Sequence, residues 1–239
     1  MAGSLSLGGP AVYDALLGAP VALVALFLLA PATGQPVRRV LRLAAPPRAA
    51  RAALVRFVPL VVAWYLLLAL SLAILLPLPG WLVDLYERLA PHSQAEMAAF
   101  LFTTVMAAPL VEELLLRGLA LSVLGTAFGR APAVMTTAIV FGAMHLAPAK
   151  AVATAAFGYM LGRAAWSTRS IVPGIAAHML ANAVALGAGL RASDTLPLPD
   201  RRAAGMALGI ALLLTPVVWR AVQRVEQASA DVEDAAAGC

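Results

Sequence analysis

Seven apolar stretches, each long enough to cross a lipid bilayer, constrain this sequence more than any other feature. They run at about 12–33, 54–77, 97–124, 131–148, 150–166, 171–190 and 203–222. A hydrocarbon core roughly 30 Å thick needs about 20 apolar residues per helix. Only 12% of the 239 residues are charged, against about 25% in soluble domains. The sequence therefore predicts an all-α, polytopic transmembrane helical bundle with short loops.

The placement of arginines predicts the orientation of this bundle. The loop after the first stretch carries most of them: Arg38, Arg39, Arg42, Arg48 and Arg51, with Arg56 just beyond. Cytoplasmic loops collect Lys and Arg, which places the amino terminus outside and, with seven spans, the carboxyl terminus inside. The net charge of +5 then reflects topology and a lipid bilayer with anionic headgroups as partner, and no nucleic acid.

Three segments with different roles follow from this division. Residues 1–96 hold the first spans and the basic loop, 97–190 hold the polar residues discussed next, and 191–239 hold the last span and an acidic tail. The lone Cys239 has no internal disulfide partner. The high content of Ala, Arg, Gly and Pro indicates a bacterium with GC-rich codons, and hence a bacterial inner membrane protein.

Span 97–124 contains charged residues where a membrane helix should be apolar. Charges at mid-bilayer cost several kcal/mol or more and usually serve a site or a pathway. Glu113 and Arg117 are four positions apart and can form an ion pair on one helix face. Glu112 projects about 100° away, which leaves it outside that pair. We interpret Glu113 and Arg117 as structural and Glu112 as functional.

Two further apolar stretches carry histidines at helical spacing. Phe141 and His145 lie one turn apart in 131–148, and His178 and Asn182 lie one turn apart in 171–190. Taken alone, either pair can be core packing or interhelical hydrogen bonding. At about 1.5 Å rise per residue, however, Glu112, His145, His178 and Asn182 all fall roughly 10–22 Å into the membrane. This convergence predicts one shared cavity reached by water.

The residues gathered there suffice for peptide hydrolysis. A carboxylate and a histidine around one water can take its proton and direct it at a carbonyl. A second histidine and an amide NH₂ can donate to the oxyanion that develops. No GxSxG is present, and Cys239 lies outside the helices. Zinc held by Glu112, His145 and His178 is the alternative to metal-free catalysis.

At these residues the sequence resembles the CAAX-processing and bacteriocin-processing (CPBP, or Abi) intramembrane proteases. The family motifs E-E-x-x-x-R, F-x-x-x-H and H-x-x-x-N match Glu112-Glu113-x-x-x-Arg117, Phe141-x-x-x-His145 and His178-x-x-x-Asn182, in order. The resemblance covers about 100–190. It implies a bundle of about eight spans in which Glu112 and His145 activate water and His178 and Asn182 hold the oxyanion. Glu113, Arg117 and Phe141 would support them, with or without zinc.

The sequence thus predicts an intramembrane endopeptidase, but it does not select the substrate. A membrane-anchored protein or peptide fits a bacterium better than a prenylated tail does. Two other classes remain open. A proton-coupled transporter also buries Glu and His, although two repeat halves with discontinuous helices are not evident. A non-catalytic immunity or scaffold protein can retain the same motifs.

Overall fold

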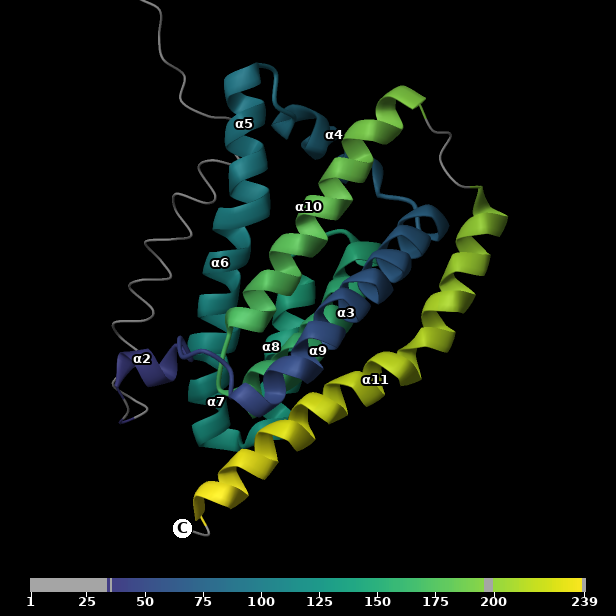
Figure 1. Cartoon of the computed structure of the whole chain (residues 1–239). Coiled ribbons are helices and arrows are strands. Elements are labelled where there is room, and N and C mark those ends of the chain that lie inside the picture. The colour runs from purple at the N-terminus through teal and green to yellow at the C-terminus, as the bar shows by residue number, and fades with distance from the viewer. Residues whose placement is uncertain (1–33, 35, 196–199, 238–239) are drawn as a thin grey trace, which may run out of the picture.

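In this computed structural model all regular structure among the described residues is helical, as the sequence predicts. The structure describes residues 34, 36–195 and 200–237 (Figure 1). The predicted first span, 12–33, lies outside the described residues. The polar motifs all lie within them.

Helices α3 (Arg48–Leu75) and α11 (Arg201–Ala237) pack against each other along much of their length and form one side of the bundle (Figure 1). The contact is apolar, with Phe57, Val61 and Val218 fully buried. Trp64 adds a polar link, because its indole N–H donates to the Ala211 carbonyl at 3.1 Å. Burial of each such apolar side chain contributes roughly 1.5–3 kcal/mol. The contact with α11 therefore helps to fix the position of α3 in the bundle.

The segment Gln94–Phe128 is one long helix with two π-helical interruptions. Its parts are α5 (Gln94–Phe102), η2 (Thr103–Ala107), α6 (Ala108–Glu113), η3 (Leu114–Ala120) and α7 (Leu121–Phe128). The helix starts at an N-cap, because the Ser93 hydroxyl accepts the Glu96 N–H at 3.2 Å. It ends at Gly129, whose φ of +82° suits glycine. Single π turns occur preferentially at functional sites, and α6 lies between two of them.

Helices α8 (Arg130–Ala143) and α9 (Pro148–Thr168) form a hairpin, and α10 (Val172–Thr195) follows. The two arms of the hairpin approach closely at Gly142, where a built Cβ would lie 2.5 Å from the Ala151 carbonyl oxygen. A turn over residues 144–147 separates them. The predicted span 131–148 is therefore too long at its carboxyl end. Proline disfavours helical geometry in the preceding residue, which explains why α8 does not continue into Pro148.

Among the described residues, four helices are long and apolar enough to cross a membrane: Arg48–Leu75, Gln94–Phe128, Val172–Leu190 and Arg201–Asp231. They match four predicted stretches and fit an integral membrane protein. The helix for 131–148 is shorter, and α9 is not among the four. Of the 21 residues of α9, 12 are buried, so protein surrounds this helix. The predicted count of seven to eight spans is not confirmed.

A short helix, α4 (Gly80–Leu89), occupies a segment that the sequence analysis treats as a loop. Leu82 is fully buried, whereas Trp81 is 59% exposed and Tyr86 is also exposed. Aromatic residues of this kind are typical of the boundary between lipid and water.

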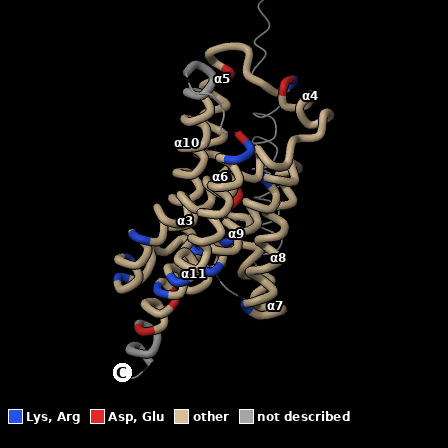
Figure 2. Tube along the Cα trace, turned by 90° about the vertical axis from the view of Figure 1, so that its right-hand side faces the viewer, with Lys and Arg blue, Asp and Glu red and all other residues tan. Residues whose placement is uncertain are grey.

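The segments predicted to face inside gather at one end of the bundle. The Ser122 hydroxyl of α7 donates to the Val40 carbonyl of α2 (Val37–Val40) at 2.8 Å. The Arg130 side chain at the start of α8 pairs with Glu226 of α11. Figure 2 shows most Lys and Arg toward this end, whereas the acidic residues of α6 lie about halfway along the bundle. These contacts bring α2, α7, α8 and α11 together at one end of the described bundle, and the side of the membrane that this end faces stays a prediction.

Candidate active site

A fully buried ion pair forms the structural centre of the site. The Arg117 Nη1 donates to Glu113 Oε1 at 2.8 Å, and neither side chain has any exposed surface. The predicted ion pair is therefore confirmed. Removing one partner of such a pair leaves an uncompensated buried charge.

Two glycines on neighbouring helices make room for this pair. A Cβ on Gly174 of α10 would lie 2.6 Å from Glu113 Oε2, and a Cβ on Gly158 of α9 would lie 2.7 Å from Arg117 Nη2. Any larger residue would force the ion pair to move. Neither glycine belongs to the sequence motifs, so neither was predicted. For Gly174 a signal exists, because it stands four residues before His178 and therefore shares its helix face.

His178 of α10 lies between the two adjacent glutamates. Its Nε2 is 3.6 Å from Glu112 Oε2, and its Nδ1 is 3.4 Å from Glu113 Oε1. The imidazole is nearly buried, whereas 21% of the Glu112 side chain remains exposed. Glu112 is thus the more exposed of the two carboxylates, and it lies outside the ion pair as predicted.

Phe141 of α8 connects the two histidines. Its ring centroid is 5.3 Å from that of His145 and 5.2 Å from that of His178, with edge-to-face geometry in both cases. The Arg117 guanidinium lies over the same ring, 4.3 Å from its centroid. Aromatic packing of this kind limits the rotamers of both imidazoles.

His145 lies in the turn after α8 and not within the helix body, contrary to the predicted span. Its Nδ1 is 2.8 Å from the Phe141 carbonyl oxygen. A carbonyl only accepts hydrogen bonds, so Nδ1 carries the proton and, in the neutral ring, Nε2 keeps the lone pair. The next residue, Leu146, has a φ of +52°, a strained value for a residue with a Cβ.

Asn182 reaches across to the long helix one turn beyond His178. Its amide NH₂ donates to the Thr104 carbonyl at 2.8 Å. In the π segment η2 the Ala108 N–H donates to Thr103, five residues back. Pro109 would be the matching donor for Thr104, but proline has no N–H. Asn182 therefore supplies a hydrogen bond that the backbone cannot make, and its second amide hydrogen remains available.

Two residues outside the motifs also act on this cluster. Lys150, near the start of α9, interacts electrostatically with both Glu112 and His145. Tyr65 of α3 interacts electrostatically with Glu112 and stacks on Phe157 with centroids 4.5 Å apart. Neither can be found from a motif, because their proximity depends on which helices become neighbours.

The predicted site residues thus fall into one connected region. The interactions above link five of them: Glu112, Glu113, Arg117, Phe141 and His178. His145 contacts this group through Phe141, and Asn182 lies one turn beyond His178 on α10. The shared hydrated cavity stays a prediction. Within the described part of the chain, no three His, Cys, Asp or Glu side chains converge to hold a metal ion. Whether Glu112, His145 and His178 bind zinc stays a prediction.

Comparison with known proteins supports the motif assignment. Residues 94–184 match the family model described as type II CAAX prenyl endopeptidase Rce1-like. No curated protein and no solved structure matches the chain. The matched segment begins with α5, ends within α10 and contains all three motifs. This family supports an intramembrane endopeptidase in general. The resemblance to the CPBP proteases is thereby confirmed for residues 94–184, which are similar to the Rce1-like endopeptidase family.

Proposed function

We propose that this protein is an intramembrane endopeptidase in which Glu112 and His145 activate the water that attacks a peptide carbonyl. One observation carries the proposal. Glu112 is the partly exposed carboxylate of an adjacent pair whose other member is held in a fully buried ion pair. It faces His178 at 3.6 Å and shares the neighbour Lys150 with His145. A carboxylate held in this way beside two imidazoles suits proton transfer better than it suits packing.

The proposed reaction needs no covalent intermediate. Glu112, assisted by His145 Nε2, takes a proton from water as the oxygen bonds to the carbonyl carbon. The negative charge that develops on the carbonyl oxygen is stabilised by His178 and by the second amide hydrogen of Asn182. The proton then passes to the amide nitrogen as the carbon–nitrogen bond breaks, and the products are a carboxylate and an amine.

The cluster lies beside apolar helix surface, so the substrate we propose is a membrane-anchored protein or peptide. The matching family is named for prenylated CAAX substrates, which are one kind of membrane-anchored substrate. Release of an anchored protein or maturation of a peptide is the form we favour for a bacterial inner membrane.

Metal-free catalysis is the form that we propose. The Nδ1–H of His145 donates to a backbone carbonyl, which would suit a base and a zinc ligand equally well. What favours the metal-free form is the arrangement of the three candidate ligands, which do not converge in the described structure. Zinc analysis of purified active protein tests this: we expect activity with less than stoichiometric zinc and no inhibition by chelators. Activity that follows zinc content would require the zinc-dependent form instead.

The experiment that tests the function is a comparison of membrane and secreted peptides from three strains. One carries the native gene, one lacks it, and one carries Glu112→Gln at native abundance. A protease leaves fragments with new termini only in the native strain. A transporter or scaffold would leave the peptide termini unchanged in all three strains, and that result would refute the proposal.

A further inference from the structure

A cavity of about 710 Å³ lies at the end of the bundle where α2 meets α7 and the end of α9. Four arginines line it: Arg38, Arg39, Arg42 and Arg169. Trp166 and Ser122 belong to the same wall. We call this cavity the arginine pocket. It plays no part in the proposed hydrolysis, which takes place on α6, α8 and α10.

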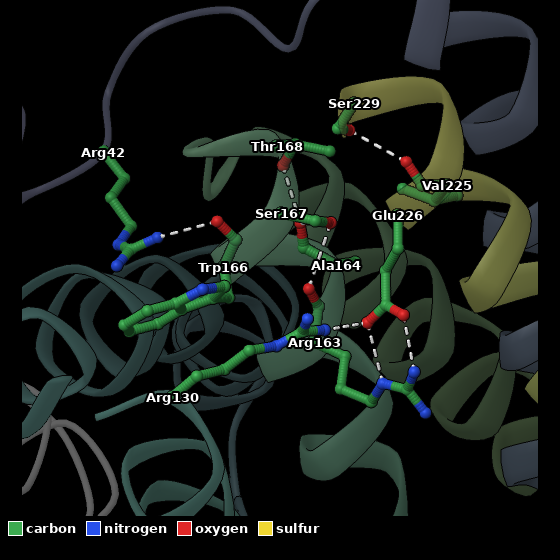
Figure 3. A network of polar contacts seen from close by, with 10 residues as sticks. All are labelled: Arg42, Arg130, Arg163, Ala164, Trp166, Ser167, Thr168, Val225, Glu226 and Ser229. Carbon is green, nitrogen blue, oxygen red and sulfur yellow. Dashed lines mark hydrogen bonds and ion pairs between the residues drawn. The ribbon is translucent and has the colours of Figure 1, made fainter. Parts of the chain in front are cut away.

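Arg42 lines the arginine pocket, and its side chain is held in place by several contacts. Its Nε donates to the Ser122 hydroxyl at 3.2 Å, and its Nη1 donates to the Ala165 and Trp166 carbonyls at 2.9 and 3.3 Å. The guanidinium carbon lies 5.1 Å from the centre of the Trp166 ring. Figure 3 shows the side chain reaching toward Trp166 from the α2 segment. Every described hydrogen-bond partner of Arg42 is neutral, so none of these partners balances its charge.

Gly125 of α7 shapes the wall that carries Trp166. A Cβ at this position would lie 2.6 Å from the Cη2 atom of the Trp166 ring. The ring therefore packs directly against the backbone of α7, and its position is fixed without a ligand. The pocket is thus preorganised, which lowers the entropy cost of binding.

Among the residues that the structure describes, no acidic side chain lines the arginine pocket. The nearest candidate in Figure 3 is Glu226, which points away toward two other arginines. Its carboxylate accepts from Arg163 Nε and Nη2 at 2.8 and 2.6 Å and also pairs with Arg130. Burial, with a smaller contribution from the charge of Arg169, lowers the pKa of Arg42 to about 10. Arg38, Arg39 and Arg42 thus bring positive charge together here, and none of the three forms an ion pair with a described carboxylate.

The chemistry of the pocket selects among anions. The Ser122 hydroxyl donates to the Val40 carbonyl and the Thr126 hydroxyl donates to the Ser122 carbonyl. The donors left for a ligand are therefore guanidinium groups, whose planar fork matches phosphate oxygens. Arg38 and Arg39 are exposed, and neither side chain has an ion-pair partner among the described residues. The pocket also lies at the predicted cytoplasmic end, where anionic lipid headgroups are concentrated.

We propose that the arginine pocket binds a phosphate group, namely that of an anionic phospholipid seated at the membrane boundary. Such a lipid would tie α2 and the ends of α7 and α9 together and would fix the amino-terminal segment against the matched segment 94–184. A free phosphate compound has the same chemistry, and the experiment below separates the two sources.

The test uses the purified full-length chain in neutral detergent. Phosphatidylglycerol or phosphatidylcholine is added, and binding is measured by native mass spectrometry and by the shift in melting temperature. The pocket variant is Arg38→Ala/Arg39→Ala, both exposed residues. The matched control is Arg220→Ala/Arg224→Ala, which removes two exposed arginines of α11 that do not line the pocket.

We expect the native protein and the control to bind phosphatidylglycerol in preference to phosphatidylcholine. The pocket variant should bind phosphatidylglycerol about 30-fold more weakly, because two arginine contacts with the anionic headgroup are lost. Glycerol phosphate in solution should compete only at far higher concentration. Binding of glycerol phosphate as tight as that of the lipid would assign the phosphate site to a soluble compound. Equal losses in the two variants, or equal binding of the two lipids, would overturn the proposal. None of these readouts depends on proteolysis.

Discussion

His178 Nε2 lies 3.6 Å from Glu112 Oε2, while the other ring nitrogen of His178 faces Glu113 at 3.4 Å. The two carboxylates therefore share one imidazole but occupy different environments. Glu113 is fully buried against Arg117, and Glu112 keeps part of its surface exposed. A pair of like groups in unlike environments can take different roles. In our account Glu113 positions the site and Glu112 reacts.

The Glu113–Arg117 pair should behave as a buried structural unit. Arg117→Met leaves Glu113 charged and unpaired, so we expect the free energy of unfolding to fall by about 3–5 kcal/mol. The double variant Glu113→Gln/Arg117→Met removes both charges and should recover most of this loss. Unfolding of the purified protein in mild detergent measures both. A double variant as unstable as Arg117→Met would show that the buried charges are not coupled.

Gly174→Ala should disturb the site from the neighbouring helix. The added methyl would lie 2.6 Å from Glu113 Oε2, and overpacking of this kind typically costs about 1–3 kcal/mol. We also expect the cleavage rate to fall, because Glu113 and His178 must shift. Gly187→Ala on the same helix is the matched control, since a Cβ there meets nothing within 4 Å. It should keep full activity and gain up to about 1 kcal/mol in helix stability. Equal effects of the two substitutions would contradict this role for Gly174.

The helices and motifs of this site can be predicted from the sequence, but the contacts between neighbouring helices cannot. Spacing alone predicts the Glu113–Arg117 pair, and the common face of Phe141 and His145 predicts their ring contact. The glycines, Lys150 and Tyr65 depend on which helices become neighbours, which a single sequence does not encode locally.

Hydropathy also fails to distinguish lipid from protein as the surroundings of a helix. The apolar stretch 150–166 therefore predicts a helix, but it does not predict that 12 residues of α9 are buried inside the protein. The end of α8 was predictable in part, because Pro148 signals a break before it. The π turn beside Thr104 arises from packing and from Pro109 together, so the contact with Asn182 has no clear sequence signature.

Asn182 should show two separable effects. Asn182→Ala removes a proposed oxyanion donor, which typically lowers kcat about 100- to 1,000-fold. It also leaves the Thr104 carbonyl without its donor, at a cost of about 1–3 kcal/mol in stability.

Adding Pro109→Ala to this variant restores a backbone N–H near Thr104 and should recover stability but not kcat. Steady-state kinetics and thermal unfolding of the single and double variants measure the two effects separately. If kcat recovers together with stability, Asn182 serves only as a link between helices.

The most direct test of the account is cleavage by Glu112→Gln, measured with a native substrate in proteoliposomes. The amide keeps the size of the side chain but accepts no proton, and Glu112 lies outside the buried ion pair. Glu87→Gln, at an exposed position of α4, is the matched control. We expect Glu112→Gln to lower the cleavage rate at least about 100-fold with unchanged thermal stability, while Glu87→Gln cleaves normally. Cleavage by Glu112→Gln at the native rate would contradict the account.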